Sequence, residues 1–254
     1  MTARHKGVGK LWLLNLFGNV ALVAAAYFWL LLPDARGWQV ALSGVMAIVV
    51  VFLGLWLRAG SFAYFRVAEF RDNATVWRAF RNAFRHITAL VVWAIPFGAV
   101  EFGLFWLRQY TPQFGVWFWQ KAPALRFGSP RQVFHAADWL LLLVMALLAA
   151  IWLPVASTVS ALGLKASRMV RSLRILRRAS YWLWFVLLIL VGGYLPYRLV
   201  WWIPELSDLR KQAWSMGVRF AVAYLLLISA WVALLLVIGD RLEKEDKIAA
   251  NSAG

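Results

Sequence analysis

Glu101 is a lone carboxylate inside a long apolar run, and its chemistry stands out first. The run covers residues 87–107 and reads ITALVVWAIPFGAVEFGLFWL. A charge in the hydrocarbon of a bilayer costs several kcal/mol unless it is paired, protonated or hydrated. A carboxyl group in this position can change its protonation state or bind a cationic group. Glu101 is therefore a candidate functional residue.

Basic and phenolic residues at a similar depth can complete a site around Glu101. At about 1.5 Å per helical residue, Glu101 lies about 9 Å from the outer end of its run, and Arg198 lies about 8 Å from the outer end of another. The candidate substrate-binding residues are Glu101, Arg198, Arg219, Tyr194 and Tyr197. In such a pocket Glu101 would change its protonation state while Arg198 or Arg219 binds a carboxylate or phosphate group.

Two other interpretations of the same residues stay open. An ion pair between Glu101 and Arg198 would fix the order of the helices, because a charge in the membrane usually has a partner. Alternatively, Arg198 and Arg219 would extend their charged ends toward lipid headgroups.

The composition is that of a membrane protein with several spans. Of the 254 residues, 63% are hydrophobic and 15% are charged, whereas soluble domains are nearer half apolar and a quarter charged. The mean hydropathy is +0.69. The chain has no cysteine, which excludes disulfides and thiolate-bound metals. The net charge of +16 clusters beside apolar runs, where it indicates topology and contact with headgroups rather than nucleic acid.

Apolar runs in the chain reach the length of about 20 residues that a membrane helix needs. All of them should be α-helical, because an isolated strand in lipid leaves its backbone polar groups unpaired. We expect an all-α bundle of membrane helices that forms one integral membrane domain over residues 1–254. The six predicted spans are Leu11–Leu32, Trp38–Leu57, Ile87–Leu107, Asp138–Val159, Ser180–Ile203 and Gly217–Gly239.

The basic residues are unevenly distributed between the two sides of these spans. With the N-terminus inside, 18 of the 27 Lys and Arg residues fall in cytoplasmic segments. This bias predicts that both termini are cytoplasmic. The first run is longer than the core of about 7–15 residues in a signal peptide, so we expect a retained span. The expected location is the cytoplasmic (inner) membrane of a bacterium.

Two basic segments, residues 74–86 and 165–178, lead into the third and fifth spans. Each places arginines on one side of a helical wheel and apolar residues on the other, which predicts amphipathic helices in the inner interface. One interpretation is that these segments bind anionic lipid or an acidic partner. The other is that they only fix the topology of the spans. Their equal spacing predicts a repeat of span, basic helix and span. The arginines recur 93 positions apart: Arg78, Arg81 and Arg85, then Arg171, Arg174 and Arg178.

Enzyme signatures are absent from the chain. It contains no HExxH motif, no GxSxG elbow and no P-loop. His5, His86 and His135 all lie outside the apolar runs, which argues against a haem or zinc site. Asp138 and Asp240, at the ends of predicted spans, are expected to act as interfacial caps. We therefore expect no enzyme activity, no cofactor and no metal.

A non-enzymatic scaffold or accessory subunit is the function that these patterns favour. Its expected partners are the bilayer, anionic headgroups, and a further membrane protein or a second copy of the chain. The alternative is a small transporter or permease module with an outward-facing site around Glu101, Arg198 and Arg219. An intramembrane lipid-modifying enzyme is a third class, for which no acid–base pair can be named.

Overall fold

Helix formation follows from hydropathy, because each backbone polar group in lipid must bond within its own segment. The computed structural model describes residues 7–33, 35–72, 76–121, 129–204 and 208–251. These residues form helices and no strand, which confirms the predicted all-α class. Among them, six helices are long and apolar enough to span a membrane, and this indicates an integral membrane protein.

The spans alternate with short helices along the chain. Residues 190–194, between α9 and α10, are π-helical, and residues 173–177 form a 3₁₀ helix. The short helices are α3 (Ala68–Asp72), α4 (Val76–Arg85), α6 (Thr111–Lys121) and α8 (Ala166–Ser172). The spans are α1 (Val8–Leu30), α2 (Gly37–Arg66), α5 (Ile87–Arg108), α7 (Pro130–Leu162), α9 with α10 (Ala179–Ile189 and Leu195–Trp201) and α11 (Leu209–Asn251).

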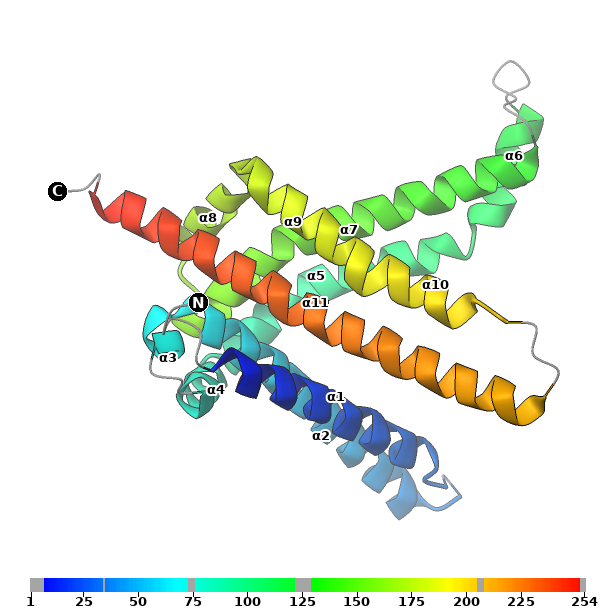
Figure 1. Ribbon diagram of the computed structural model, residues 1–254, viewed down its shortest axis with the longest axis horizontal. Helices are drawn as coiled ribbons and strands as arrows, with labels where there is room; N and C mark the ends of the chain where they lie inside the picture. The colour runs from blue at the N-terminus through cyan, green and yellow to red at the C-terminus, as the bar shows by residue number, and fades with distance from the viewer. Residues whose placement is uncertain (1–6, 34, 73–75, 122–128, 205–207, 252–254) are drawn as a thin grey trace.

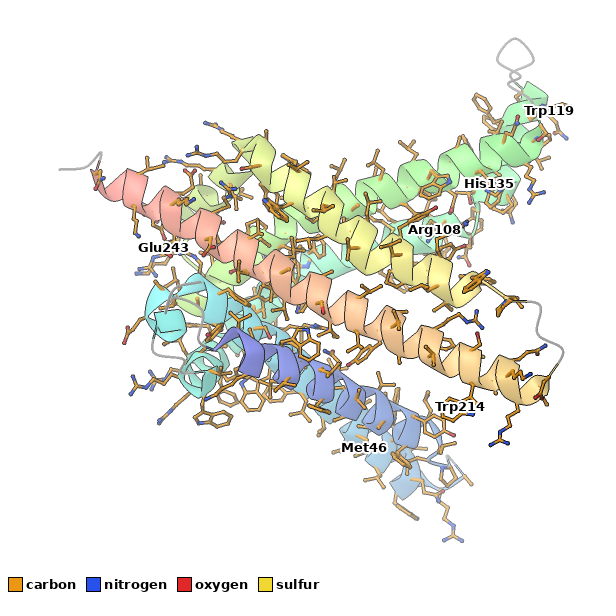
Figure 2. All side chains as sticks on the ribbon, viewed as in Figure 1. Met46, Arg108, Trp119, His135, Trp214 and Glu243 are labelled. Atoms are coloured by element: carbon orange, nitrogen blue, oxygen red, sulfur yellow. The ribbon has the colours of Figure 1, made fainter. Side chains whose placement is uncertain are left out.

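The spans form three antiparallel pairs: α1 with α2, α5 with α7, and α9–α10 with α11. Figure 1 shows that the pairs meet at one end and spread apart toward the other. We call these the converged end, where α1 begins and α11 ends, and the splayed end, where α1 ends and α11 begins. In Figure 2, Trp119 on α6 and Trp214 on α11 lie far apart at the splayed end.

An aromatic layer joins the three pairs near the converged end. The ring of Phe62 on α2 packs edge-on against Trp152 of α7 and Trp231 of α11, with centroid distances of 6.1 and 5.6 Å. Small and aliphatic residues continue the core from this layer toward the converged end. The buried members include Ala63, Val155, Ala156, Val159, Leu235, Ile238 and Leu242.

Two glycines let the helices of the core approach closely. Cβ atoms at Gly60 and Gly239 would overlap the ring of Phe80 on α4 and the backbone oxygen of Phe65 on α2, respectively. Close backbone approach of this kind drives helix association in lipid, where the apolar environment supplies no hydrophobic force between helices.

The helices extend beyond the spans that hydropathy predicts. α2 continues past Leu57 to Arg66, α7 begins at Pro130 rather than Asp138, and α11 runs on past Gly239 to Asn251. The added turns of α2 and α11 are polar in part, but they pack together at the converged end, where Ser61 is fully buried. Packing, rather than hydropathy, therefore sets these helix ends.

The helix boundaries recur at the interval of the arginines. α2 and α7 begin 93 positions apart, and α5 and α10 end 93 positions apart. α2 and α7 also begin in the same way, because Gln39 accepts a bond from the backbone N–H of Arg36 at 2.9 Å and Gln132 accepts one from Ser129 at 3.0 Å. The two predicted units thus begin with the same capping pattern and end at equivalent positions, but α5 is continuous whereas a π segment separates α9 from α10.

The contact at Gly239 yields a direct test of the core. We expect Gly239→Ala to destabilise the protein by about 1–3 kcal/mol, because overpacking forces backbone shifts. Gly217→Ala is the matched control, since it lies on the same helix with no other atom within 4 Å of the added methyl group. Thermal unfolding in detergent measures both. Equal unfolding temperatures for the two variants would contradict the close approach of α2 and α11.

Candidate functional site

Glu101 lies on the face of α5 that packs against α7. On the same face, Phe97 stacks on Trp152 at 4.8 Å, and Arg108 pairs with Asp138 of α7. Glu101 lies between these two contacts along the helix. Its Oε1 atom is buried and has no hydrogen-bond partner. The carboxyl group therefore lies on the side of α5 toward α7, and one of its oxygens is buried without a hydrogen-bond partner.

The other candidate pocket residues lie on the third helix pair. The exposed side chains of Tyr194, Tyr197 and Arg198 project from the end of the π segment and from α10. Arg219 on α11 is half-buried, and its guanidinium donates to the backbone oxygens of Ser215 at 3.1 Å and Leu199 at 3.5 Å.

The structure brings Arg198, Arg219, Tyr194 and Tyr197 to one helix pair and leaves Glu101 on another. In the part of the chain that the structure describes, no ion pair joins Glu101 to Arg198, so that predicted contact is not formed. A hollow of about 530 Å³ between α10 and α11 includes Arg219 in its lining but not Glu101.

Arg108 and Asp138 form a bidentate ion pair that joins α5 to α7 near the splayed end. The nitrogens Nε and Nη2 of Arg108 donate to the two carboxylate oxygens at 2.7 and 3.0 Å. Figure 2 shows Arg108 on the side of α5 toward α7. Asp138 is thus an interhelical partner inside α7 rather than the helix cap that was expected. The reason is that α7 begins two turns earlier, at Pro130.

Arg58 is a half-buried cation within a candidate span, and sequence reasoning missed it. It lies inside α2, two turns before the end of the helix. Its Nη2 donates to Oδ1 of Asn19 on α1 at 2.9 Å, and its guanidinium lies 5.0 Å from the ring centroid of Trp231 on α11. Both partners are neutral, and no described carboxylate pairs with it. A signal was present, because Arg58 is followed by seven uncharged residues before Arg66.

Further polar contacts surround Arg58 and hold α1 in place. Asn15 donates to the hydroxyl of Ser61 on α2 at 2.9 Å, and both side chains are fully buried. Trp12 donates to the hydroxyl of Ser229 on α11 at 3.1 Å, and Tyr224 of α11 donates to the backbone oxygen of Leu16. This cluster ties α1 to both α2 and α11, so a structural role accounts for its geometry.

The helix α4 has three distinct faces. Ala79, Phe80 and Ala83 are buried, and Phe80 packs on α2 at Gly60. A second face exposes Trp77 and Phe84, whose rings contact Trp56 and Phe52 of α2 at 5.9 and 6.1 Å. The third face exposes the predicted residues Arg78, Arg81 and Arg85, which have no ion pair with any residue that the structure describes.

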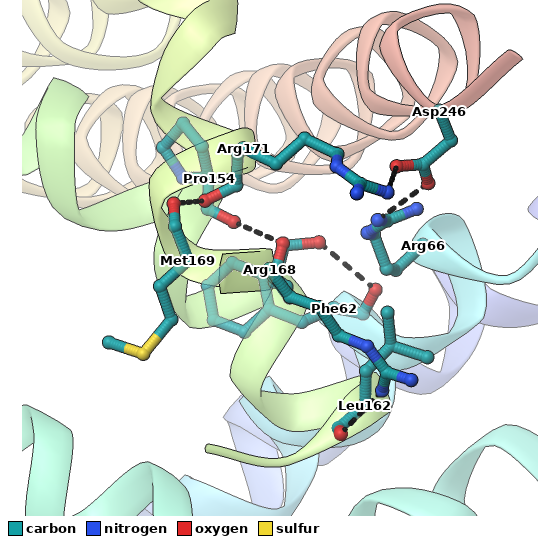
Figure 3. Close-up of polar contacts among 11 residues, drawn as sticks. Phe62, Arg66, Pro154, Leu162, Arg168, Met169, Arg171 and Asp246 are labelled. Atoms are coloured by element: carbon teal, nitrogen blue, oxygen red, sulfur yellow. Dashed lines mark hydrogen bonds and ion pairs between the residues drawn. The ribbon is translucent and has the colours of Figure 1, made fainter. Parts of the chain in front are cut away.

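The second basic segment is neutralised in part by the end of α11. Asp246 accepts from Arg66 at 2.7 Å and lies 3.9 Å from Arg171, as Figure 3 shows. Arg178 binds Glu245 at 2.7 Å. Arg174 lies exposed on the 3₁₀ helix. The two predicted arginine sets therefore differ, because two members of the second have acidic partners within the chain.

Comparisons with known proteins do not add a function. No protein family, no curated protein and no solved structure matches this chain. Among the described residues there is also no group of three His, Asp or Glu side chains that could hold a metal ion. The geometry of the described side chains is therefore the basis for a functional proposal.

The pairing of Arg58 with Asn19 yields a second test. We expect Asn19→Leu to cost about 1–3 kcal/mol of stability, because it leaves a half-buried guanidinium N–H without its acceptor. Arg58→Leu in the same chain should recover part of that cost, since the unpaired donor is then absent. Thermal unfolding of both single variants and the double variant measures the coupling. Strictly additive costs would contradict the contact.

Proposed function

We propose that this protein is a non-enzymatic scaffold or accessory subunit of the bacterial cytoplasmic membrane, held on anionic lipid by α4. The observation that carries the proposal is the exposed face of Arg78, Arg81 and Arg85, which lacks any described ion-pair partner. In this proposal the converged end faces the cytoplasm, where basic residues and anionic headgroups both concentrate.

The faces of α4 support an interfacial position. A helix at a membrane surface buries one side against protein or acyl chains and directs its cations to headgroups. Trp77 is 70% exposed and Phe84 is 53% exposed, yet both continue the apolar surface that Phe52 and Trp56 form on α2. Large apolar side chains in this place are suited to acyl chains, and the adjacent arginines are suited to phosphate groups.

An acidic protein partner is the other ligand that such a face can take. We favour lipid because the apolar and basic faces of α4 adjoin each other, as the acyl and headgroup layers of a bilayer do. In the second basic segment, Arg171 and Arg178 already have Asp246 and Glu245 as acidic partners. The proposal therefore assigns the main lipid contact to α4.

A charge-neutralising variant tests the lipid contact. Each Lys or Arg near an anionic surface contributes about 1 kcal/mol, so three arginines together contribute about 3 kcal/mol. We expect Arg78→Gln, Arg81→Gln and Arg85→Gln in one chain to lower the preference for anionic over zwitterionic lipid by about 100-fold at low salt. Spin-labelled phosphatidylglycerol in vesicles that are otherwise phosphatidylcholine measures this preference.

The matched control neutralises three cations away from the converged end. Lys121, Arg210 and Lys211 lie at the splayed end and are exposed, and their change to Gln removes the same charge. This control should keep the lipid preference of the parent protein. An unchanged preference in the α4 variant would contradict the lipid role and leave an acidic protein as the ligand of that face.

A small transporter or permease module is the second candidate, and one observation favours it. Oε1 of Glu101 is buried without a hydrogen-bond partner, and such groups in membrane spans often carry protons or ions. Arg198 and Arg219 would then act on the third helix pair, where Tyr194 and Tyr197 also lie. The π segment that precedes α10 is a type of irregularity that often occurs at functional sites.

Proton flux into vesicles tests this candidate without a known substrate. If Glu101 carries protons, Glu101→Gln should abolish the flux that the reconstituted parent protein supports, as measured with an entrapped pH-sensitive dye. The flux with Arg210→Gln should remain, because Arg210 is exposed at the start of α11 and is outside the candidate site. Equal flux for the parent protein and Glu101→Gln, with both proteins folded, would remove Glu101 from the mechanism.

A further inference from the structure

A second cationic site lies at the converged end, between the start of α9 and the end of α11. A hollow of about 300 Å³ opens there. α9 contributes its N-cap residue Arg178, and α11 contributes side chains that recur at helical spacing on one face. The lining residues are Arg178, Arg241, Lys244, Glu245, Lys247 and Ile248.

The charges around this hollow do not balance. Glu245 accepts from Nη2 of Arg178 at 2.7 Å, and Lys247 donates to Glu243 at 2.8 Å. Arg241 and Lys244 have no ion pair with any residue in the described ranges. Two cations in the lining are thus compensated and two are not, so the hollow has an excess of positive charge.

We propose that this hollow binds the phosphate group of an anionic ligand at the membrane surface. Two uncompensated cations match the charge of a phosphate monoester, or of two phosphodiesters, better than that of a single carboxylate. Glu245 binds Nε and Nη2 of Arg178, which holds the guanidinium in a defined orientation. The other edge of the planar guanidinium, which includes Nη1, can then donate to phosphate oxygens. Arg241 and Lys244 supply the remaining charge from the opposite helix.

Two features of the surroundings favour an anion at this place. α9 begins at Arg178 without a side-chain cap, so its first backbone N–H groups add positive potential beside the hollow. Ile248 is 52% exposed in the lining and gives the ligand an apolar contact. This lining is suited to the phosphate of a phospholipid, and it is also suited to a free phosphate from the aqueous side.

This site is separate from the proposed contact at α4. It uses residues of α9 and α11, whereas α4 presents Arg78, Arg81 and Arg85. The α4 variant therefore leaves it intact, and a failure of one proposal does not affect the other.

Two measurements distinguish the sources of the phosphate. Native mass spectrometry of the gently extracted protein reports phospholipid that stays bound. Isothermal titration of the delipidated protein with inorganic phosphate reports binding from solution. We expect the parent protein to retain phospholipid or to bind inorganic phosphate, and we expect Arg241→Gln with Lys244→Gln to weaken that binding at least tenfold.

The matched control changes Arg210 and Lys211 to Gln, because both residues lie on the same helix at the splayed end. It should bind as the parent protein does.

Loss of phospholipid alone in the test variant identifies a lipid headgroup, and loss of inorganic phosphate binding identifies a free phosphate ligand. If the double variant does not fold, Lys244→Glu replaces it, because this position is exposed, and the same loss of binding is expected. A parent protein that binds neither probe, or a test variant that binds as tightly as the parent, would overturn the proposal.

Discussion

The close approach of α2 to α11 at the converged end is the contact on which the remaining structure depends. In lipid, helices associate through van der Waals packing and polar contacts, because the surrounding acyl chains are as apolar as the helix surfaces. Gly239 leaves room for the backbone of Phe65. The ring contacts of Phe62 with Trp152 and Trp231 then join α7, and with it the pair of α5 and α7, to α2 and α11. Beyond that layer the pairs spread apart, as Figure 1 shows.

This convergence also decides which charges remain available. Helices that meet at one end bring acidic residues near the end of α11 to the basic residues of α2 and of the segment after α7. Asp246 thereby contacts Arg66 and Arg171, and Figure 3 shows both arginines directed at it. A cation that is paired inside the protein attracts anionic lipid less strongly than an unpaired one does. The surface electrostatics at this end therefore follow from the packing, and not from the number of basic residues alone.

Polar groups within the spans show a similar dependence on packing. Arg58 has a neutral acceptor and an aromatic ring as partners, which moderates the cost of burying a cation among the helices. Glu101 has one oxygen without any partner, although Arg108 on the same helix face is paired with Asp138. Proximity along a helix thus does not predict which charge receives a partner, because the partner belongs to the helix that packs on that face.

Hydropathy and the spacing of arginines are enough to predict an all-α membrane protein with six spans and two basic segments, because lipid permits few other structures for such runs. The same local patterns identify Glu101 as unusual. They do not reveal that Glu101 and Arg198 lie on different helix pairs, that Asp138 binds Arg108, or that Arg178 binds Glu245. Those contacts join residues distant in the chain, and their formation depends on helix lengths and on the close approach at Gly239, which no local pattern specifies.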